Sequence, residues 1–197
     1  MPESISLGDT LQAADVDRLF VITGGPGSGK STLIDALAGH GIAGMPEAGR
    51  AIIQEQMAIG GEALPWSDRR TFAELMLSRE IRSYRAALKL SGPVVFDRGV
   101  PDVAGYLRLC GLSIPLHVHK AAQMFRYHRR VFIAPPWPEI FTQDGQRKQS
   151  LEEARATCEA MQETYSELDY ELISIPLDSI EKRVRFILSA RGLLARY

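Results

Sequence analysis

The chain of 197 residues has the length of one ordinary domain and is long enough to bury a substantial core. Its 23 Lys and Arg side chains balance 24 Asp and Glu side chains, so the formal charge is −1 and no basic surface for DNA or RNA is expected. No run of 18 apolar residues could span a membrane, and residues 1–18 contain no apolar segment typical of a signal peptide. We expect a cytoplasmic protein with an N-terminal extension at 1–18 and a single domain at 19–197.

Strand and helix patterns alternate through the first half of the domain. In chain order they predict a strand at 19–23, a helix beginning at Lys30, a short strand at 42–46, a helix at 48–59, a helix at 67–90 and a strand at 94–96. The strands are apolar runs rich in β-branched residues, which is typical of strands buried on both faces of a parallel sheet. Glycines follow these helices and end them.

The second half continues the alternation. It predicts a helix with Pro101 in its first turn, a helix at 116–127, a strand at 131–134, a helix opened by the capping box Ser150–Glu153, a strand at 172–175 and a last helix. The polar, proline-broken segment at about 135–150 is expected to form a small lid. Together the elements predict a three-layer α/β fold with a five-stranded parallel sheet, whose functional site lies beyond the carboxyl ends of the strands.

A glycine-rich motif separates the first strand from the first helix. The segment Gly24–Ser31 matches G-x-x-x-x-G-K-[ST], the phosphate-binding loop of P-loop proteins. Glycines let such a loop curl until its amide groups face phosphate oxygens, and the helix N-terminus adds its positive dipole. Lys30 would contact the β- and γ-phosphates, and Ser31 would hold Mg²⁺. The residues predicted to bind ATP or GTP are Gly24, Gly25, Pro26, Gly27, Ser28, Gly29, Lys30, Ser31 and Thr32.

An acid and an arginine follow the strand at 94–96. Asp97 lies where P-loop proteins place an acid that binds Mg²⁺ or activates the acceptor of the phosphoryl group, although it could instead cap the next helix. Arg98 could hold an anionic acceptor or the transferring phosphoryl group, or it could be a surface charge. We interpret Asp97 as a catalytic and metal-binding residue, and Arg98 as a catalytic and acceptor-binding residue.

Three more charged residues are candidates for the same site. If the short strand at 42–46 lies beside the first strand, Glu47 faces the cleft, where it could take a proton from an acceptor hydroxyl or hold an acceptor group. Alternatively, Glu47 is an acid at a helix N-terminus that interacts with the helix dipole. Arg50 could bind the acceptor or pair with Glu47. Arg147, beside Lys148 in the predicted lid, could close over the γ-phosphate or could remain a solvated charge.

Two other patterns argue against a metal site and against a signalling GTPase. His117 and His119 are two residues apart in a predicted helix and face different directions, which argues against a metal site. The segment Asp102–Gly105 matches the D-x-x-G of GTPases, but it falls inside a predicted helix, and no N-K-x-D motif is present to read guanine. Arg126, Arg129 and Arg130 are expected to be packing or surface charges, although they could form one local basic patch. This leaves the compact layout of nucleotide and metabolite kinases.

Several segments share a pattern with a known family, and they cover nearly all of the chain after residue 18. They are Gly24–Ser31, Pro46–Arg50, Val95–Gly99, Pro101-Asp102, Arg130–Trp137, Asp144, Arg147–Gln149 and Tyr165. On these segments the chain resembles the small ATPases, described as an AAA domain, that are grouped with the ribosylnicotinamide kinase domain of NadR. Gln146 stands before the Arg-Lys pair, where the family often has an acid. The resemblance implies a kinase-type P-loop fold that uses Mg²⁺ with ATP or GTP, and it implies no particular acceptor.

Two function hypotheses follow. The first is a Mg²⁺-dependent phosphotransferase or ATPase with an unidentified small-molecule acceptor, in which Lys30, Asp97, Glu47, Arg98 and Arg147 act on the transferring group. The alternative is a nucleotide-dependent switch or binding protein with slow hydrolysis, whose partner is a protein or an anionic lipid. The basic patch favours the alternative, whereas the order of loop, acid-arginine pair and lid favours the first.

Overall fold

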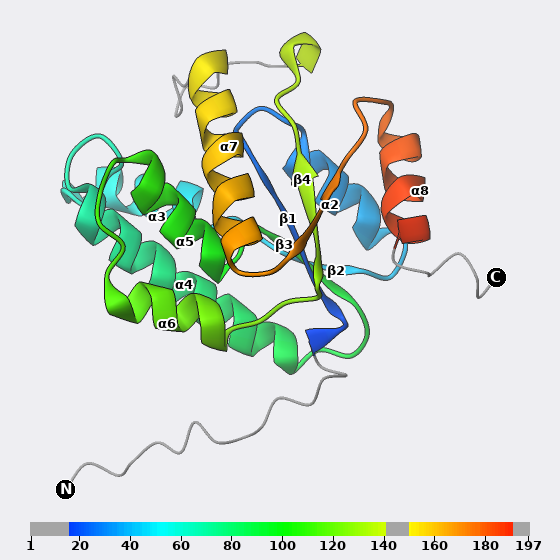
Figure 1. Ribbon diagram of the computed structural model, residues 1–197, viewed down its shortest axis with the longest axis horizontal. Helices are drawn as coiled ribbons and strands as arrows, with labels where there is room; N and C mark the ends of the chain where they lie inside the picture. Colours follow the sequence, from blue (N-terminus) through cyan, green and yellow to red (C-terminus); the bar gives the residue numbers. More distant parts are fainter. Residues whose placement is uncertain (1–15, 141–149, 191–197) are drawn as a thin grey trace, which may run out of the picture.

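The computed structural model describes residues 16–140 and 150–190 of the chain. Figure 1 shows a central sheet with helices on both sides. In chain order the elements are β1 (Leu19–Gly24), α2 (Lys30–Ala38), β2 (Ala43–Met45), α3 (Ala48–Ile59), α4 (Arg69–Leu88), β3 (Val94–Asp97), α5 (Val100–Leu109), α6 (Leu116–Met124), β4 (Arg130–Ala134), the 3₁₀ helix η1 (Pro138–Ile140), α7 (Leu151–Glu167), β5 (Glu171–Ser174) and α8 (Ile180–Ala190). Within these described ranges, no helix is long and apolar enough to cross a membrane.

The strands form one parallel sheet in the order β2-β3-β1-β4-β5. The central strand β1 pairs Leu19 with Val94 of β3 and Gly24 with Ala134 of β4. Because the strands run in the same direction, β1 and β3 both end at one edge of the sheet, where the connections to α2 and α5 begin. The predicted three-layer α/β fold with a five-stranded parallel sheet is confirmed.

Alternate side chains of β1 build two separate cores. Leu19 and Val21 pack with α3, α4 and α5 and with Tyr165 of α7, whereas Phe20 and Ile22 pack with α2 and α8. Successive strand residues point to opposite faces of the sheet, so one apolar run supplies both layers. In Figure 1, α2 and α8 accordingly lie on one side of the sheet and α3 to α7 on the other.

One expectation about a single element is wrong, and one condition set for Glu47 is not met. The helix expected to reach Tyr127 ends at Met124, because Tyr127 enters the core, where its hydroxyl oxygen accepts a hydrogen bond from the Val100 amide at 3.1 Å. Strand β2 lies beside β3 and not beside β1, so the condition under which Glu47 was expected to face the cleft is not met.

The predicted lid and N-terminal extension are described only in part. The described part of the predicted lid segment contains η1, but residues 141–149, which include Arg147 and Lys148, lie outside the described residues. Residues 1–15 of the predicted extension also lie outside them. Arg18, which follows, donates hydrogen bonds to the carbonyl oxygens of Ala87 at 3.1 Å and Leu88 at 2.9 Å, so the start of β1 is tied to the end of α4.

Candidate functional site

The loop between β1 and α2 is wedged between neighbouring backbone segments. A Cβ on Gly24 would overlap the carbonyl oxygen of Ala134 in β4, and a Cβ on Gly25 would overlap that of Ala154 in α7. Glycine alone fits at either position, so this pair lets the chain turn from the sheet edge into the helix. Close backbone packing therefore requires glycine at Gly24, the first residue of the motif, and also at Gly25.

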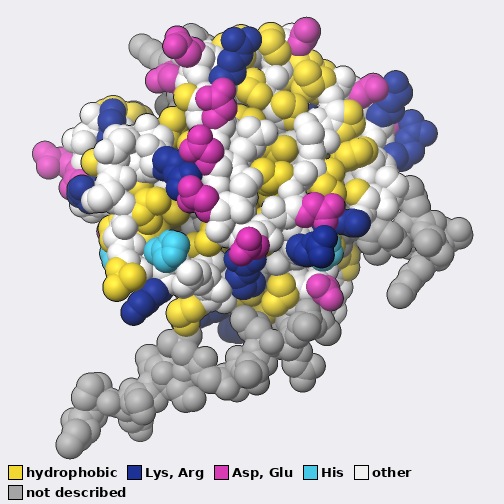
Figure 2. All heavy atoms as spheres, in the orientation of Figure 1, with side chains coloured by type: hydrophobic (Ala, Val, Ile, Leu, Met, Phe, Trp, Pro, Cys, Tyr) yellow, Lys and Arg dark blue, Asp and Glu magenta, His cyan; other side chains and the backbone are white. Residues whose placement is uncertain are grey.

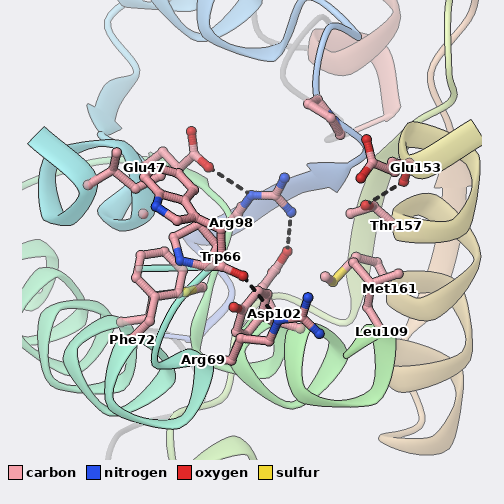
Figure 3. Close-up of a pocket in the computed structure, with 16 residues that line it drawn as sticks. Glu47, Trp66, Arg69, Phe72, Arg98, Asp102, Leu109, Glu153, Thr157 and Met161 are labelled. Atoms are coloured by element: carbon pink, nitrogen blue, oxygen red, sulfur yellow. Dashed lines mark hydrogen bonds and ion pairs between the residues drawn. The ribbon is translucent and has the colours of Figure 1, made fainter. Parts of the chain in front are cut away.

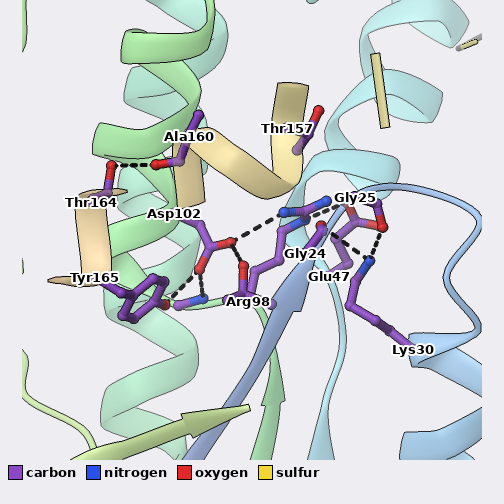
Figure 4. Close-up of polar contacts among 12 residues, drawn as sticks. Gly24, Gly25, Lys30, Glu47, Arg98, Asp102, Thr157, Ala160, Thr164 and Tyr165 are labelled. Carbon is purple, nitrogen blue, oxygen red and sulfur yellow. Dashed lines mark hydrogen bonds and ion pairs between the residues drawn. The ribbon is translucent and has the colours of Figure 1, made fainter. Parts of the chain in front are cut away.

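The ammonium group of Lys30 lies against the loop itself (Figure 4). Its Nζ donates to the carbonyl oxygens of Gly25 at 2.7 Å and Gly24 at 3.4 Å, and the hydroxyl of Ser28 also donates to Gly25, at 2.9 Å. Lys30 is only 7% exposed, and it begins α2, so a buried cation and a helix N-terminus coincide. Such an arrangement attracts phosphate. Thr32 lies in the first turn of the same helix and is exposed.

Asp97, the last residue of β3, faces the start of α2. Its Oδ2 accepts a hydrogen bond from the Ser31 hydroxyl at 3.0 Å, and its buried Oδ1 has no hydrogen-bond partner among the described residues. Burial raises the pKa of Asp97 and the charge of Glu47 adds to this, while Lys30 and Arg98 act in the opposite direction. An unpaired buried carboxylate oxygen next to a hydroxyl is a hard-oxygen donor set, which fits Mg²⁺.

Arg98 joins two carboxylates across the site. Its Nε lies 3.2 Å from Oε1 of Glu47, and its Nη1 lies 3.1 Å from Oδ1 of Asp102 in α5 (Figure 4). Its backbone adopts a φ of 75°, which is uncommon for a residue with a side chain. Burial lowers the pKa of Arg98, but the charges of Glu47, Asp102 and Asp97 outweigh burial and raise it. The alternative of a surface charge is therefore wrong, since Arg98 is a buried, permanently charged centre.

Asp102 is a site residue that sequence reasoning missed. Its carboxylate accepts hydrogen bonds from Arg98, the Thr23 hydroxyl, the Gly99 amide at 2.9 Å and the Tyr165 hydroxyl at 2.6 Å. Asp102 lies inside α5, in agreement with the argument that its D-x-x-G segment is not a GTPase motif. Its side chain is only 1% exposed and lies at the centre of this hydrogen-bond network. An acid at the third position of a helix, four residues after an arginine, is the local signal that could have identified it.

A cavity of about 340 Å³ opens beside the phosphate loop. We call it the aromatic cavity, because Trp66, Phe72 and Tyr106 line it. Figure 3 shows Trp66 and Phe72 on one side of it and Met161 on the other, with Arg98 and Asp102 between them. The cavity is also lined by Pro26 of the loop and by Glu47. Apolar walls around a few convergent charged groups are typical of a small-molecule site.

A second cavity of about 490 Å³ shares Glu47 with the first. Ser31 and Asp97 line this second cavity, and so does Arg50, which is exposed. Of the predicted acceptor-binding residues, Glu47 and Arg98 thus line the first cavity, whereas Arg50 lines the second. Glu47 lies between the aromatic cavity and the Ser31–Asp97 pair even though β2 does not neighbour β1.

A second buried acid that sequence reasoning missed lies in α4. Glu80 is 3% exposed, and burial, together with the negative charges of Asp102 and Glu47, raises its pKa well above the usual 4.5. The folded protein therefore holds the Glu80 proton more tightly than the unfolded chain does. The stability that this group contributes is complete below the unfolded pKa and is lost as the pH rises through the higher folded pKa.

We therefore expect Glu80→Gln, which keeps a neutral polar side chain, to lose less stability than the wild type when the pH rises from about 5 to about 9. Urea denaturation at several pH values measures the free energy of unfolding. Glu159→Gln, which changes an exposed acid on α7, is the control and should follow the wild type. If the free energy of unfolding of Glu80→Gln changes with pH in parallel with that of the wild type, the expectation of a raised pKa for Glu80 is contradicted.

The arginines of the predicted basic patch have partners at the surface. Arg129 and Arg130 lie 3.2 and 3.4 Å from the carboxylate of Glu171. The guanidinium of Arg126 lies 4.0 Å from the ring centroid of Tyr170 and donates to a backbone carbonyl of the chain. Figure 2 shows basic and acidic side chains interspersed over the face in view. The positive charge of this basic patch, which is the feature that favours a lipid-binding or protein-binding switch, is thus partly neutralised.

Comparison with known proteins agrees with this geometry. Residues 19–183, which are most of the chain, match a family model described as an AAA domain. A search of curated protein sequences found no significant match.

Solved structures with a similar fold are kinases and NadR. A deoxyadenosine kinase from M. mycoides with the products dCMP and dCDP has 12% identity and a TM-score of 0.62, covering 88% of this chain and 98% of that chain. NadR in complex with NR has 18% identity and a TM-score of 0.60, covering 92% of this chain and 52% of that chain. Shikimate kinase from Acinetobacter baumannii in complex with shikimate has 15% identity and a TM-score of 0.55, covering 91% and 94%. At these identities the likeness shows a P-loop kinase-like fold alone.

Proposed function

Because the chain belongs to the AAA domain family of P-loop NTPases, with a fold related to that of NadR-like kinase domains, we propose that it is a Mg²⁺-dependent phosphotransferase. It would transfer the γ-phosphoryl group of ATP or GTP to a hydroxyl group of a small molecule. The observation that carries the proposal is the cavity of about 340 Å³ in which the phosphate loop meets Glu47, Arg98 and Asp102.

Each charged residue of the site has a separate role in the proposed reaction. Lys30 and the loop amides would bind the β- and γ-phosphates. Ser31 and Asp97 would hold Mg²⁺, which when bound neutralises charge on the phosphates. Glu47 lines the aromatic cavity and Asp97 does not, so we assign the proton of the acceptor hydroxyl to Glu47. Arg98 fixes the Glu47 carboxylate through their contact at 3.2 Å.

The bond changes follow from these positions. The acceptor oxygen forms a bond to the γ-phosphorus, the bond from that phosphorus to the β,γ-bridging oxygen breaks, and the hydroxyl proton passes to Glu47. The nucleoside diphosphate leaves with the bridging oxygen. Positioning and charge stabilisation would supply most of the rate, as is general for phosphoryl transfer.

The charge balance of the aromatic cavity favours an acceptor that carries no phosphate. Its lining residues bear three carboxylates and two guanidinium groups, which belong to Glu47, Asp102, Glu153, Arg69 and Arg98. Arg98 already serves two of these carboxylates, so an anionic acceptor would enter a site of net negative charge. The rings of Trp66 and Phe72 favour a flat partner. We infer that the acceptor is an uncharged alcohol with a planar ring, the class to which nucleosides belong.

A panel of acceptors tests this proposal. Nucleosides, their monophosphates and shikimate, a carboxylated alcohol, are each added to protein with Mg²⁺-ATP or Mg²⁺-GTP, and nucleoside diphosphate formation is measured. We expect stimulation by a nucleoside and none by its monophosphate. Stimulation by the monophosphate alone would contradict the charge argument, and stimulation by protein or anionic vesicles alone would favour the nucleotide-dependent switch.

Glu47→Gln should lower kcat for the stimulating acceptor by ~10²–10⁴-fold, since the variant retains the size of the side chain but loses the proton acceptor. The KM for the nucleotide should change little, because the phosphate loop is untouched. Glu55→Gln makes the same change in an exposed residue of the same helix and should behave as the wild type. Equal kcat values for Glu47→Gln and wild type would transfer the role of base to Asp97.

A further inference from the structure

One buried cation next to the phosphate loop has no part in the mechanism above. Arg183, in the first turn of α8, is 2% exposed, and the neighbouring side chains Val184, Ile187 and Leu188 anchor this helix against α2. Its Nη2 donates a hydrogen bond to the backbone carbonyl oxygen of Ser28 at 3.0 Å. A residue 155 positions later in the chain thus touches the centre of the loop.

This hydrogen bond fixes the direction of the Ser28–Gly29 peptide in the predicted phosphate loop. In a planar trans peptide the N–H points opposite to the C=O. Holding the Ser28 carbonyl toward Arg183 therefore turns the Gly29 amide away from Arg183, into the loop. A Cβ on Gly29 would lie 2.8 Å from Nη1 of Arg183, so the guanidinium packs directly against this glycine. Gly29 also has a φ of 71°, which few other residues adopt.

The charge of Arg183 is not balanced within the part of the chain that the structure describes. No ion pair joins it to a carboxylate of residues 16–140 or 150–190, and its buried Nε has no hydrogen-bond partner among them. Burial alone lowers its pKa, with no opposing carboxylate. The ring of Trp137 covers the guanidinium at 5.3 Å from the ring centroid. A buried charge of this kind is costly unless an anion approaches it.

We propose that Arg183 is a positioning residue of the nucleotide site, and that the phosphates of the bound nucleotide balance its charge. It orients the Gly29 amide through the Ser28 carbonyl, and its positive charge adds to that of Lys30 at the loop. The inference rests on the proposed nucleotide site and adds a residue from outside the loop to it. The loop would then be incomplete without α8.

Removal of the Arg183 charge should lower the affinity for nucleotide without lowering the stability of the protein. Arg183→Met keeps an apolar chain under Trp137 but removes the charge and the hydrogen bond to Ser28. We expect the affinity for Mg²⁺-ATP to fall ~10-fold or more. The Tm of the protein without nucleotide should stay equal or rise, because an unbalanced buried charge is removed. A residue that only supports the fold would show the reverse: a lower Tm and unchanged affinity.

Calorimetric titration with Mg²⁺-ATP and thermal unfolding with and without nucleotide measure both quantities. Arg185→Met, two residues further along the same helix and exposed, is the matched control and should bind as the wild type. If Arg183→Met does not fold, Arg183→Lys is used in its place, because it keeps the positive charge. The ammonium group lacks the planar, multiple-donor geometry of a guanidinium, so we expect Arg183→Lys to weaken binding by ~3-fold or more. Affinity within twofold of the wild type in the folded variant would overturn the inference. Absence of binding to the wild type would instead overturn the proposed function.

Discussion

Replacement of Lys30 by alanine is expected to lower turnover of ATP or GTP by ~10²–10³-fold or more. Its ammonium group is the cation that the loop itself holds, at 2.7 Å from the Gly25 carbonyl oxygen, and no other residue of the loop carries a positive charge. Without it the developing charge on the β,γ-bridging oxygen would lose the one cationic side chain that the loop supplies. Calorimetry with Mg²⁺-ATP, Mg²⁺-GTP and ADP would show the loss of binding, and a diphosphate assay the loss of turnover.

The fold should survive this substitution. The hydrogen bonds of Lys30 go to the loop, where each is worth about 1 kcal/mol, and the apolar contacts of α2 are made by Leu33, Ile34 and Leu37. The Tm of Lys30→Ala should therefore remain within a few degrees of the wild type. Lys89→Ala, at the exposed end of α4, makes the same change far from the loop and should retain full binding. Full turnover by Lys30→Ala would remove the phosphate loop from the mechanism.

The strands of the sheet and the phosphate loop could be predicted because both have characteristic local sequence patterns. The apolar run of β1 is continuous, and the glycines of the loop stand between it and a helical periodicity, so neighbouring residues carry the information. The same local logic predicts α3 at its observed bounds, Ala48–Ile59. The order of the strands depends on contacts between distant segments, so the neighbour of β2, which is β3, could not be predicted and was left open.

The buried charges could not be predicted in this way. Asp102, Glu80 and Arg183 each stand in an amphipathic helix, where a charged residue is ordinarily exposed. Their burial follows from how α5, α4 and α8 pack on the sheet, and only the folded chain brings Asp102 to Tyr165 and Arg183 to Ser28. The roles of Asp97 and Glu47 stayed open for the same reason, since a strand-end acid has the same sequence pattern whichever cavity it lines.

Substitution of Asp102 by alanine should have the largest effect on stability, a loss of about 3–5 kcal/mol in the free energy of unfolding. Four donors converge on this carboxylate, and removing it leaves the Thr23 and Tyr165 hydroxyls and the Gly99 amide without their acceptor. Arg98 would keep its contact with Glu47 at 3.2 Å but would lose the contact with Asp102, so its buried positive charge would be only partly compensated. Each unsatisfied buried group adds to the cost.

Urea denaturation of Asp102→Ala, Asp102→Asn and Glu167→Ala separates burial from charge pairing. Glu167 also pairs with an arginine, Arg108, but its side chain is 64% exposed, so its removal should change the free energy of unfolding by no more than ~1 kcal/mol. Asp102→Asn keeps one acceptor oxygen and should fall between the other two variants. A cost below ~1 kcal/mol for Asp102→Ala would mean that water or a rearranged Glu47 replaces the carboxylate. A large cost would establish that the network holding Arg98 in the aromatic cavity also holds α5 to β1, which couples the geometry of the acceptor site to the stability of the fold.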